Sequence, residues 1–247
     1  MTCRNNIVVT TGDPMNFRST SLATTVLAAV TVLAVAACAP SDKQIQAWVE
    51  KNPDIIIKSL QGFQRKQQED AAPKPEMVKE FSKELFENAG SPTVGNGKVK
   101  IAYFFDFNCG HCTKQGETIN EVLKKTKDVT IIYKNFPILA PSSETAAKAA
   151  LAANLQGKYK EYYDELYKPA NHGRDDATLE KAAKAIKLDM AKWKTDKDGE
   201  AVKAELDHVR TLAGKLKLSG TPLIAIAPDQ IFPGRVDQLM EIVQKAL

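Results

Sequence analysis

Apolar runs and amphipathic stretches alternate along the second half of the chain. Four of the apolar runs are short and rich in β-branched or aromatic residues, which predicts strands. They are Val99–Phe105, Val129–Tyr133, Leu223–Ala227 and Ile231–Phe232. Residues 142–218, between the second and third runs, show helical patterning almost throughout. This order predicts an α/β fold with an all-helical insertion.

Helices are expected around and between these strands. One spans residues 76–87 and is followed by a loop at residues 88–97 that is rich in Gly, Pro and Asn. Another begins at the cysteines after the first strand and runs to about Lys127. The insertion is expected to contain four helices and the chain to close with a fifth. These are Glu144–Leu155, Tyr159–Tyr167, Ala177–Ile186, Glu200–Leu216 and Val236–Leu247.

Residues 38–75 are expected to form an N-terminal amphipathic helical arm and a linker. Ser41 is a suitable N-cap for a first helix, and a second helix carries Ile56, Leu60 and Phe63 at i, i+4 and i+7 spacing. The stripe has no companion helix in the arm, so it must pack either on the rest of the chain or on a second copy. We expect a homo-oligomer formed through residues 41–70, with packing inside one chain as the alternative.

Residues 1–37 are expected to be a secretory signal. A short positive start from Met15 to Arg18 precedes the uncharged apolar run Leu22–Ala37. Cys38 then follows small residues in a pattern that resembles the bacterial lipobox, whose cysteine is lipidated and becomes the mature N-terminus. The run is shorter than a comfortable membrane span.

Ordinary cleavage after the small residues is the alternative, but Pro40 would then follow the cut. The polar stretch Met1–Pro14 fits no part of a signal, so Met15 is the expected initiator and Cys3 would be absent from the protein. The expected location is the periplasm, with a lipid anchor. Ala39, rather than an aspartate, after the lipidated cysteine slightly favours the outer membrane.

The small net charge of the chain argues against a nucleic acid as its partner. The chain has 34 basic and 30 acidic residues, a formal net charge of +4. So small a surplus over this length is not the footprint of a nucleic-acid-binding protein. Basic pairs such as Lys124-Lys125 are better explained as solvated helix faces.

The motif Cys109-Gly110-His111-Cys112 lies where the first strand gives way to a helix. A thiolate attacks a disulfide, and a second thiol within reach then resolves the mixed disulfide. A cysteine at a helix N-terminus is favoured as thiolate by the helix dipole. A structural bridge across two residues would close a tiny loop and stabilise little. The motif therefore favours redox catalysis.

The cysteine pair is also compatible with two kinds of metal site. A zinc site needs about four ligands, and outside the motif the chain offers only Cys3, Cys38, His172 and His208. A periplasmic Cu(I)-binding or copper-protection protein could use the cysteine pair, since soft thiolates suit that ion. No Met-rich or His-rich tract supports a dedicated copper carrier. No cofactor and no metal are expected.

With the cysteine motif and Gly220-Thr221-Pro222 together, the chain resembles the thioredoxin fold and, within it, the DsbA-like thiol–disulfide oxidoreductases. The similarity covers about residues 76–247. Its matching segments are Phe104–Cys112, Lys134–Leu139, Ala146–Ala153, Gly220–Pro222 and Phe232–Gly234. The arm at residues 44–69 is similar to that of the suppressor-of-copper-sensitivity C-like subgroup, in which it makes some members oligomers with isomerase activity.

The resemblance implies a role for each site residue. Cys109 would be the nucleophile, exposed at the helix tip, and Cys112 the resolving thiol, more buried and of higher pKa. His111 would be a donor near the Cys109 thiolate. Thr221 and Pro222 would form a cis-proline loop whose backbone pairs with substrate. The implied partners are exported cysteine-containing client proteins and a membrane redox partner, and the implied activity is disulfide formation, isomerisation or both.

The chain departs from the family at one position. Many relatives carry a buried acid six residues before the first cysteine, where it moves protons at the resolving thiol. Tyr103 stands at that position here. Asp106, Lys134, water or the substrate itself could take over the transfer, and the sequence does not choose among them.

Overall fold

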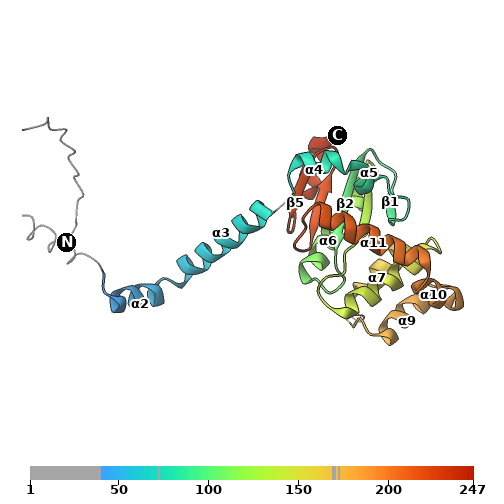
Figure 1. Ribbon diagram of the computed structural model, residues 1–247, viewed down its shortest axis with the longest axis horizontal. Coiled ribbons are helices and arrows are strands. Elements are labelled where there is room, and N and C mark those ends of the chain that lie inside the picture. Colours follow the sequence, from blue (N-terminus) through green and yellow to red (C-terminus); the bar gives the residue numbers. More distant parts are fainter. Residues whose placement is uncertain (1–39, 72, 169–170, 172) are drawn as a thin grey trace, which may run out of the picture. The chain divides into compact units, whose positions relative to one another are not determined.

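The computed structural model describes residues 40–247 except positions 72, 169–170 and 172 (Figure 1). The predicted signal at residues 1–37 and the predicted lipidation site Cys38 lie outside the described residues. The chain divides into two units, one ending at Leu60 and the other beginning at Gln61. Within the described residues, no helix combines the length and the hydropathy that a bilayer crossing requires.

Helices occupy the two positions expected for the arm. α2 spans Asp42–Lys51 and begins with a capping box, in which Ser41 and Gln44 satisfy each other's backbone N–H groups. α3 spans Pro53–Ala71. Their large apolar side chains are exposed, from 39% for Val49 to 60% for Phe63. The apolar stripe of the arm is therefore available for packing.

A five-stranded sheet forms the centre of the second unit, in the order β1-β3-β2-β4-β5. The strands are β1 Thr93–Gly95, β2 Val99–Phe105, β3 Val129–Asn135, β4 Leu223–Ile226 and β5 Gln230–Pro233. β2 and β3 run parallel, and the other neighbouring pairs are antiparallel. The four predicted strands are confirmed at or close to their expected limits.

β1 was expected to be loop. It has only three residues and lies among Gly, Pro and Asn, so no local pattern marks it. Its formation depends on β3, with which it pairs from Thr93↔Ile132 to Gly95↔Thr130. Gly95 has φ +88°, and a Cβ there would lie 2.3 Å from the Val129 carbonyl oxygen, so the strand can end only at a glycine.

Nine helices accompany the sheet in the described part of the second unit, after α3. They are α4 Pro75–Glu80, α5 Ser82–Phe86, α6 Gly110–Lys125, α7 Pro141–Asn154, α8 Tyr159–Leu166, α9 Asp176–Ala185, α10 Met190–Lys197, α11 Glu200–Lys215 and α12 Leu239–Ala246. The single helix expected over residues 76–87 is divided into α4 and α5 at Phe81.

α10 was not expected, because half of its residues are lysine or aspartate and its sequence shows no continuous apolar face. Asp189 caps its first turn by accepting the Lys192 N–H. Trp193 is fully buried, and its indole N–H donates to the Ala149 carbonyl of α7 at 2.9 Å. One tertiary anchor thus supports a helix that lacks a local signal.

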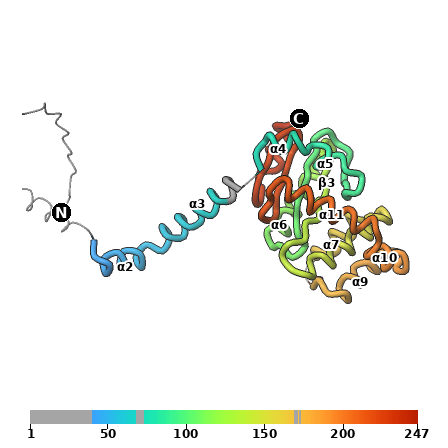
Figure 2. The backbone as a smooth tube through the Cα atoms, viewed as in Figure 1, coloured from blue at the N-terminus to red at the C-terminus, as the bar shows by residue number. Residues whose placement is uncertain are grey.

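Strand alternation divides the core between the two faces of the sheet. Ile101, Tyr103 and Phe105 of β2 point to the face covered by α6, α12 and the helices α7–α10, and this face also holds both cysteines. Ala102 and Phe104 point to the opposite face, covered by α4, α5 and α11. In Figures 1 and 2, α11 crosses the sheet, and α7, α9 and α10 gather at the end of the unit away from the C-terminus.

The helices between β3 and β4 form the predicted all-helical insertion. Its first member, α7, is alanine-rich, and Ala146, Ala149, Ala150, Ala152 and Ala153 are all fully buried. Small side chains let neighbouring helices approach closely, so a helix with little apolar bulk still serves as the centre of the insertion.

Candidate active site

The sheet topology brings the cysteine motif and the Thr221–Pro222 loop together. β4 is antiparallel to β2, with Phe104 opposite Leu223, so the start of β4 lies beside the end of β2. The motif follows the end of β2, and Thr221 and Pro222 precede the start of β4. The peptide bond between Thr221 and Pro222 is cis, as the resemblance predicted.

Cys109 is the N-cap residue of α6. Its sulfur accepts the Cys112 N–H at 3.3 Å, and its thiol donates to the Thr221 carbonyl at 3.4 Å. The hydrogen bond from the Cys112 thiol, with others from the Thr221 side chain and from the backbone N–H groups of Cys112 and His111, lowers the pKa of Cys109 from 9.0 to about 6. At neutral pH the reduced centre therefore carries a thiolate on Cys109.

Cys109 was expected to be exposed at the helix tip, and this expectation is wrong. Only 7% of Cys109 is accessible. The Thr221 carbonyl covers the sulfur on one side, whereas Gly110 and His111 are exposed and a Cβ on Gly110 would meet nothing within 4 Å. The exposed side of the motif is therefore the one formed by Gly110 and His111.

Cys112 has the opposite character. It is fully buried, and this burial raises its pKa far above the ordinary range for a thiol; the hydrogen bond that it donates to Cys109 raises the pKa further. No disulfide joins the two residues. One thiol is thus ready to attack while its neighbour holds its proton, the asymmetry that an attacking and a resolving cysteine require.

His111 contributes its backbone to the site. Its N–H is one of the groups that lower the pKa of Cys109, and its side chain is exposed. Among the described residues its ring has no hydrogen-bond partner. The role of the imidazole as a donor to the thiolate stays a prediction.

Asp106 and Arg174 hold the turn before Cys109, and sequence reasoning did not assign them this role. The buried Asp106 carboxylate accepts the N–H groups of Asn108, Ile138 and Leu139 at 2.8–2.9 Å. It thereby joins the motif to the segment that follows β3.

Arg174, in the segment before α9, donates to the Phe107 carbonyl through Nε and Nη2 at 3.3 and 3.1 Å. Its guanidinium also lies 5.9 Å from the ring centres of Phe107 and Tyr167. Burial lowers its pKa, although a guanidinium remains charged. No sequence signal marked Arg174, because it reaches the site only through the fold.

Lys134 and Tyr103, two residues considered for proton transfer, lie on opposite faces of the sheet. Lys134 points to the sheet face opposite the cysteines, where its ammonium donates to the Glu84 carbonyl and the Ser91 hydroxyl. Burial lowers its pKa to about 8, while Glu205 and Glu84 partly offset this effect. Tyr103 is fully buried on the cysteine face, and its hydroxyl donates to the Cys112 carbonyl at 2.9 Å.

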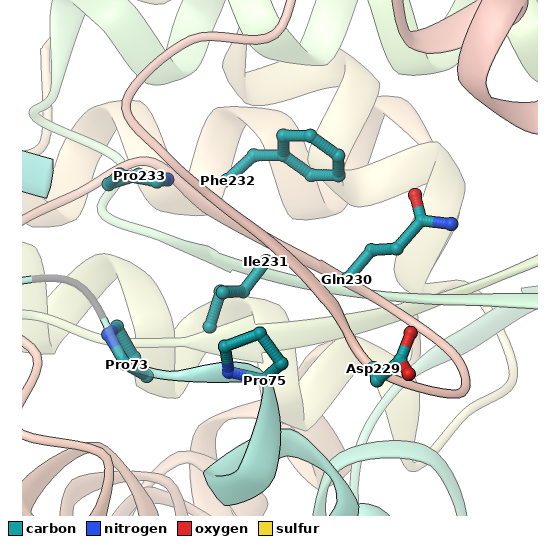
Figure 3. Close-up of a pocket in the computed structure, with 7 residues that line it drawn as sticks. All are labelled: Pro73, Pro75, Asp229, Gln230, Ile231, Phe232 and Pro233. Carbon is teal, nitrogen blue, oxygen red and sulfur yellow. The ribbon is translucent and has the colours of Figure 1, made fainter.

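A hollow of about 550 Å³ lies elsewhere, along the edge strand β5. Figure 3 shows Ile231 pointing toward Pro75 and Phe232 pointing in the opposite direction. The remaining lining residues are Pro73, Asp229, Gln230 and Pro233. The lining contains no thiol, histidine or amine, so it offers no group for thiol–disulfide exchange. In the described part of the chain, no three side chains of His, Cys, Asp or Glu gather as metal ligands.

The geometry defines a class of protein. A thioredoxin fold that places a thiol of lowered pKa and a fully buried thiol of raised pKa at the start of one helix contains a thiol–disulfide exchange centre. The chain belongs to the family of DSBA-like thioredoxin domains, whose family model matches residues 100–244. It is accordingly a thiol–disulfide oxidoreductase of that family.

Known proteins show the same relationship. The "Probable disulfide bond formation protein D" of Bacillus anthracis is 25% identical over 184 residues, which cover 68% of this chain and 84% of that protein. A thioredoxin-like oxidoreductase from Silicibacter pomeroyi is 31% identical with a TM-score of 0.62, over 66% of this chain and 96% of the other. The catalytic domain of Proteus mirabilis ScsC is 25% identical with a TM-score of 0.60, over 70% and 97%.

Proposed function

We propose that this protein is an exported, lipid-anchored oxidoreductase that forms and isomerises disulfide bonds in periplasmic proteins through Cys109-Gly110-His111-Cys112. Cys109 attacks or is attacked by client sulfur, and Cys112 resolves the mixed disulfide. Cys38 carries the lipid. Clients are exported proteins with cysteines, and a membrane redox partner resets the pair.

The observation that carries this proposal is the difference between the two thiols. A pKa of about 6 at Cys109 stabilises the reduced form, because the thiolate is populated at neutral pH. Stabilising the reduced form makes a centre more oxidising. We therefore expect a reduction potential between about −120 and −200 mV, the range between DsbA and protein disulfide isomerase. A value near −270 mV, that of thioredoxin, would contradict the oxidant role.

Client binding is supported by the surface next to Cys109. Ile138 and Leu139 are 43% and 54% exposed, and their backbone N–H groups are held by Asp106. The same carboxylate holds the backbone of Asn108, which precedes Cys109. We infer that unfolded clients place apolar side chains here while their backbone pairs with Thr221.

The exposed stripe on α2 and α3 supports an oligomer. Large apolar side chains this accessible on two successive helices favour association. An oligomer would hold several dithiol centres around one misfolded client, which favours isomerisation over simple oxidation. A monomer that only oxidises is the competing outcome.

Refolding of scrambled ribonuclease tests the proposal, with oligomer mass measured for each variant. Leu60→Lys and Phe63→Lys place charge in the stripe, whereas Gln64→Lys on the same helix is the matched control. We expect the parent and the control to be oligomers that isomerise, and the stripe variants to be monomers that only oxidise. A monomeric parent with unchanged activity in every variant would reject the arm's role.

Active-site variants test the assignment of the cysteines. Cys109→Ser should abolish activity. Cys112→Ser should trap mixed disulfides with client proteins, and failure to trap any would contradict the order of attack. Cys38→Ala should release the protein from the membrane fraction if Cys38 carries the lipid.

A further inference from the structure

Thiol–disulfide exchange at this centre requires a proton to enter and leave a buried site. When the reduced protein attacks a disulfide, the Cys109 thiolate bonds to one sulfur and expels the other as a thiolate. Cys112 must then lose its thiol proton before its sulfur can attack the Cys109 sulfur. In the reverse direction Cys112 leaves as a thiolate and takes a proton back. Cys112 is fully buried, so water has no direct access to it.

The two charged groups that the sequence offers for this transfer, Asp106 and Lys134, do not supply it. The Lys134 ammonium is bonded on the other face of the sheet. The Asp106 carboxylate is buried and already accepts three backbone N–H groups, so both of its oxygens are engaged. Neither group is free to exchange a proton with the Cys112 sulfur.

Tyrosine hydroxyls occupy the space behind Cys112 instead. Tyr103 donates to the Cys112 carbonyl at 2.9 Å. Tyr163 and Tyr167 belong to the same aromatic cluster, with ring centres 4.7 Å apart. Burial raises the pKa of Tyr167, and negative charge on Cys112 would raise it further, which places this hydroxyl within electrostatic reach of the thiol.

The Tyr163 and Tyr167 hydroxyls have spare hydrogen-bonding capacity. Both oxygens are buried and have no hydrogen-bond partner among the described residues. Burying a hydroxyl without a partner costs about 1–3 kcal/mol. Gly116, one turn after Cys112, makes room for one of them, because a Cβ there would lie 2.5 Å from the Tyr163 hydroxyl oxygen.

We propose that Tyr103, Tyr163 and Tyr167 relay the proton between the Cys112 thiol and solvent, with water bridging the hydroxyls. In the deprotonating direction, an oxygen of the chain accepts the Cys112 proton while its own proton passes to the next oxygen, and one proton leaves to a solvent base. No tyrosine is ionised at the end of the transfer. Tyr167 is partly accessible while its hydroxyl oxygen is buried, so the proposed chain reaches solvent through water beside this residue.

A small aromatic disulfide separates the two steps of exchange. The reduced protein releases one coloured aromatic thiolate when Cys109 attacks and a second when Cys112 resolves, so two kinetic phases report the two events. The inference rests on exchange at this cysteine pair. Loss of the first phase would refute the proposed function itself, whereas the relay concerns the second phase alone.

Phenylalanine substitutions remove the hydroxyls and keep the rings. General acid–base groups contribute about 100- to 10,000-fold, and one member of a bridged chain contributes less. We expect Tyr103→Phe, Tyr163→Phe and Tyr167→Phe each to slow the second phase at pH 7 by about tenfold, with recovery at higher pH or on addition of imidazole. The first phase should be unchanged.

Tyr162→Phe is the matched control. Tyr162 is fully buried in the neighbouring part of α8, and its hydroxyl donates to the Leu179 carbonyl at 3.0 Å. Its removal loses a buried hydrogen bond without touching the relay. The relay is refuted if the three variants keep a second phase within about twofold of the parent from pH 6 to 9, or if Tyr162→Phe slows that phase equally.

Discussion

Acidification provides a direct test of the Cys109 environment, because the pKa of this thiol falls from 9.0 in its ordinary state to about 6 in the folded protein. A depressed pKa stabilises the folded, reduced protein where the thiolate exists. The contribution is complete above about pH 9 and is lost as pH falls through about 6. Three pKa units correspond to about 4 kcal/mol. We expect about half of this, because the titration of Cys109 is coupled to that of Cys112 and because solvent beside the start of α6 screens the interaction.

The assay is alkylation of the reduced protein by iodoacetamide as a function of pH, with denaturant unfolding measured at the same pH values. Half of the maximal alkylation rate should occur near pH 6. Cys109→Ser should remove about 2 kcal/mol of the change in unfolding free energy between pH 9 and 5. Protonation of the Cys109 thiolate removes its contribution to stability. The free energy of unfolding of the parent should therefore fall more steeply toward acid pH than that of the variant.

The Cys112 thiol is the largest cause of the low pKa, and two substitutions separate it from the other donors. Cys112→Ala removes the donor and should raise the pKa of Cys109 by at least about one unit, whereas Cys112→Ser keeps a hydroxyl donor and should leave it low. A parent midpoint above pH 8, or equal midpoints in the two variants, would refute this account.

Two further substitutions test the turn that holds the nucleophile. Arg174→Met should lower the free energy of unfolding by about 3 kcal/mol, because it removes charged hydrogen bonds to the buried Phe107 carbonyl; a loss below about 1 kcal/mol in urea unfolding would contradict this. Asp106→Asn should cost about 1–2 kcal/mol, because an amide cannot accept all three N–H groups of Asn108, Ile138 and Leu139. It should also slow client oxidation, and an unchanged rate would show that this tether does not position the client surface.

Much of the fold could be predicted from local pattern. β2 is an apolar run interrupted only by the half-buried Lys100, because a strand buried on both faces needs apolar residues at its buried positions. α6 begins at the cysteines, where strand patterning ends, and no proline interrupts the chain before the helix ends at Lys125. The elements that prediction missed, β1 and α10, have no such pattern. β1 forms because its backbone pairs with the edge of β3. α10 forms because Trp193 packs against α7 and donates a hydrogen bond to it.

Some features of the candidate site could likewise be predicted from the sequence, and others depend on the tertiary structure. The sequence by itself determined the dithiol and its place at a strand–helix junction, because spacing along one helix or turn is a local property; the Thr221–Pro222 loop facing the dithiol was implied by the family resemblance alone. Only the tertiary structure decided that Thr221 covers Cys109, that Arg174 clamps Phe107, that Lys134 faces away and that tyrosine hydroxyls lie behind Cys112. These contacts join residues up to 112 positions apart. Burial and strand register set the pKa values and the direction of each side chain, and both arise from long-range packing that no local window of sequence contains.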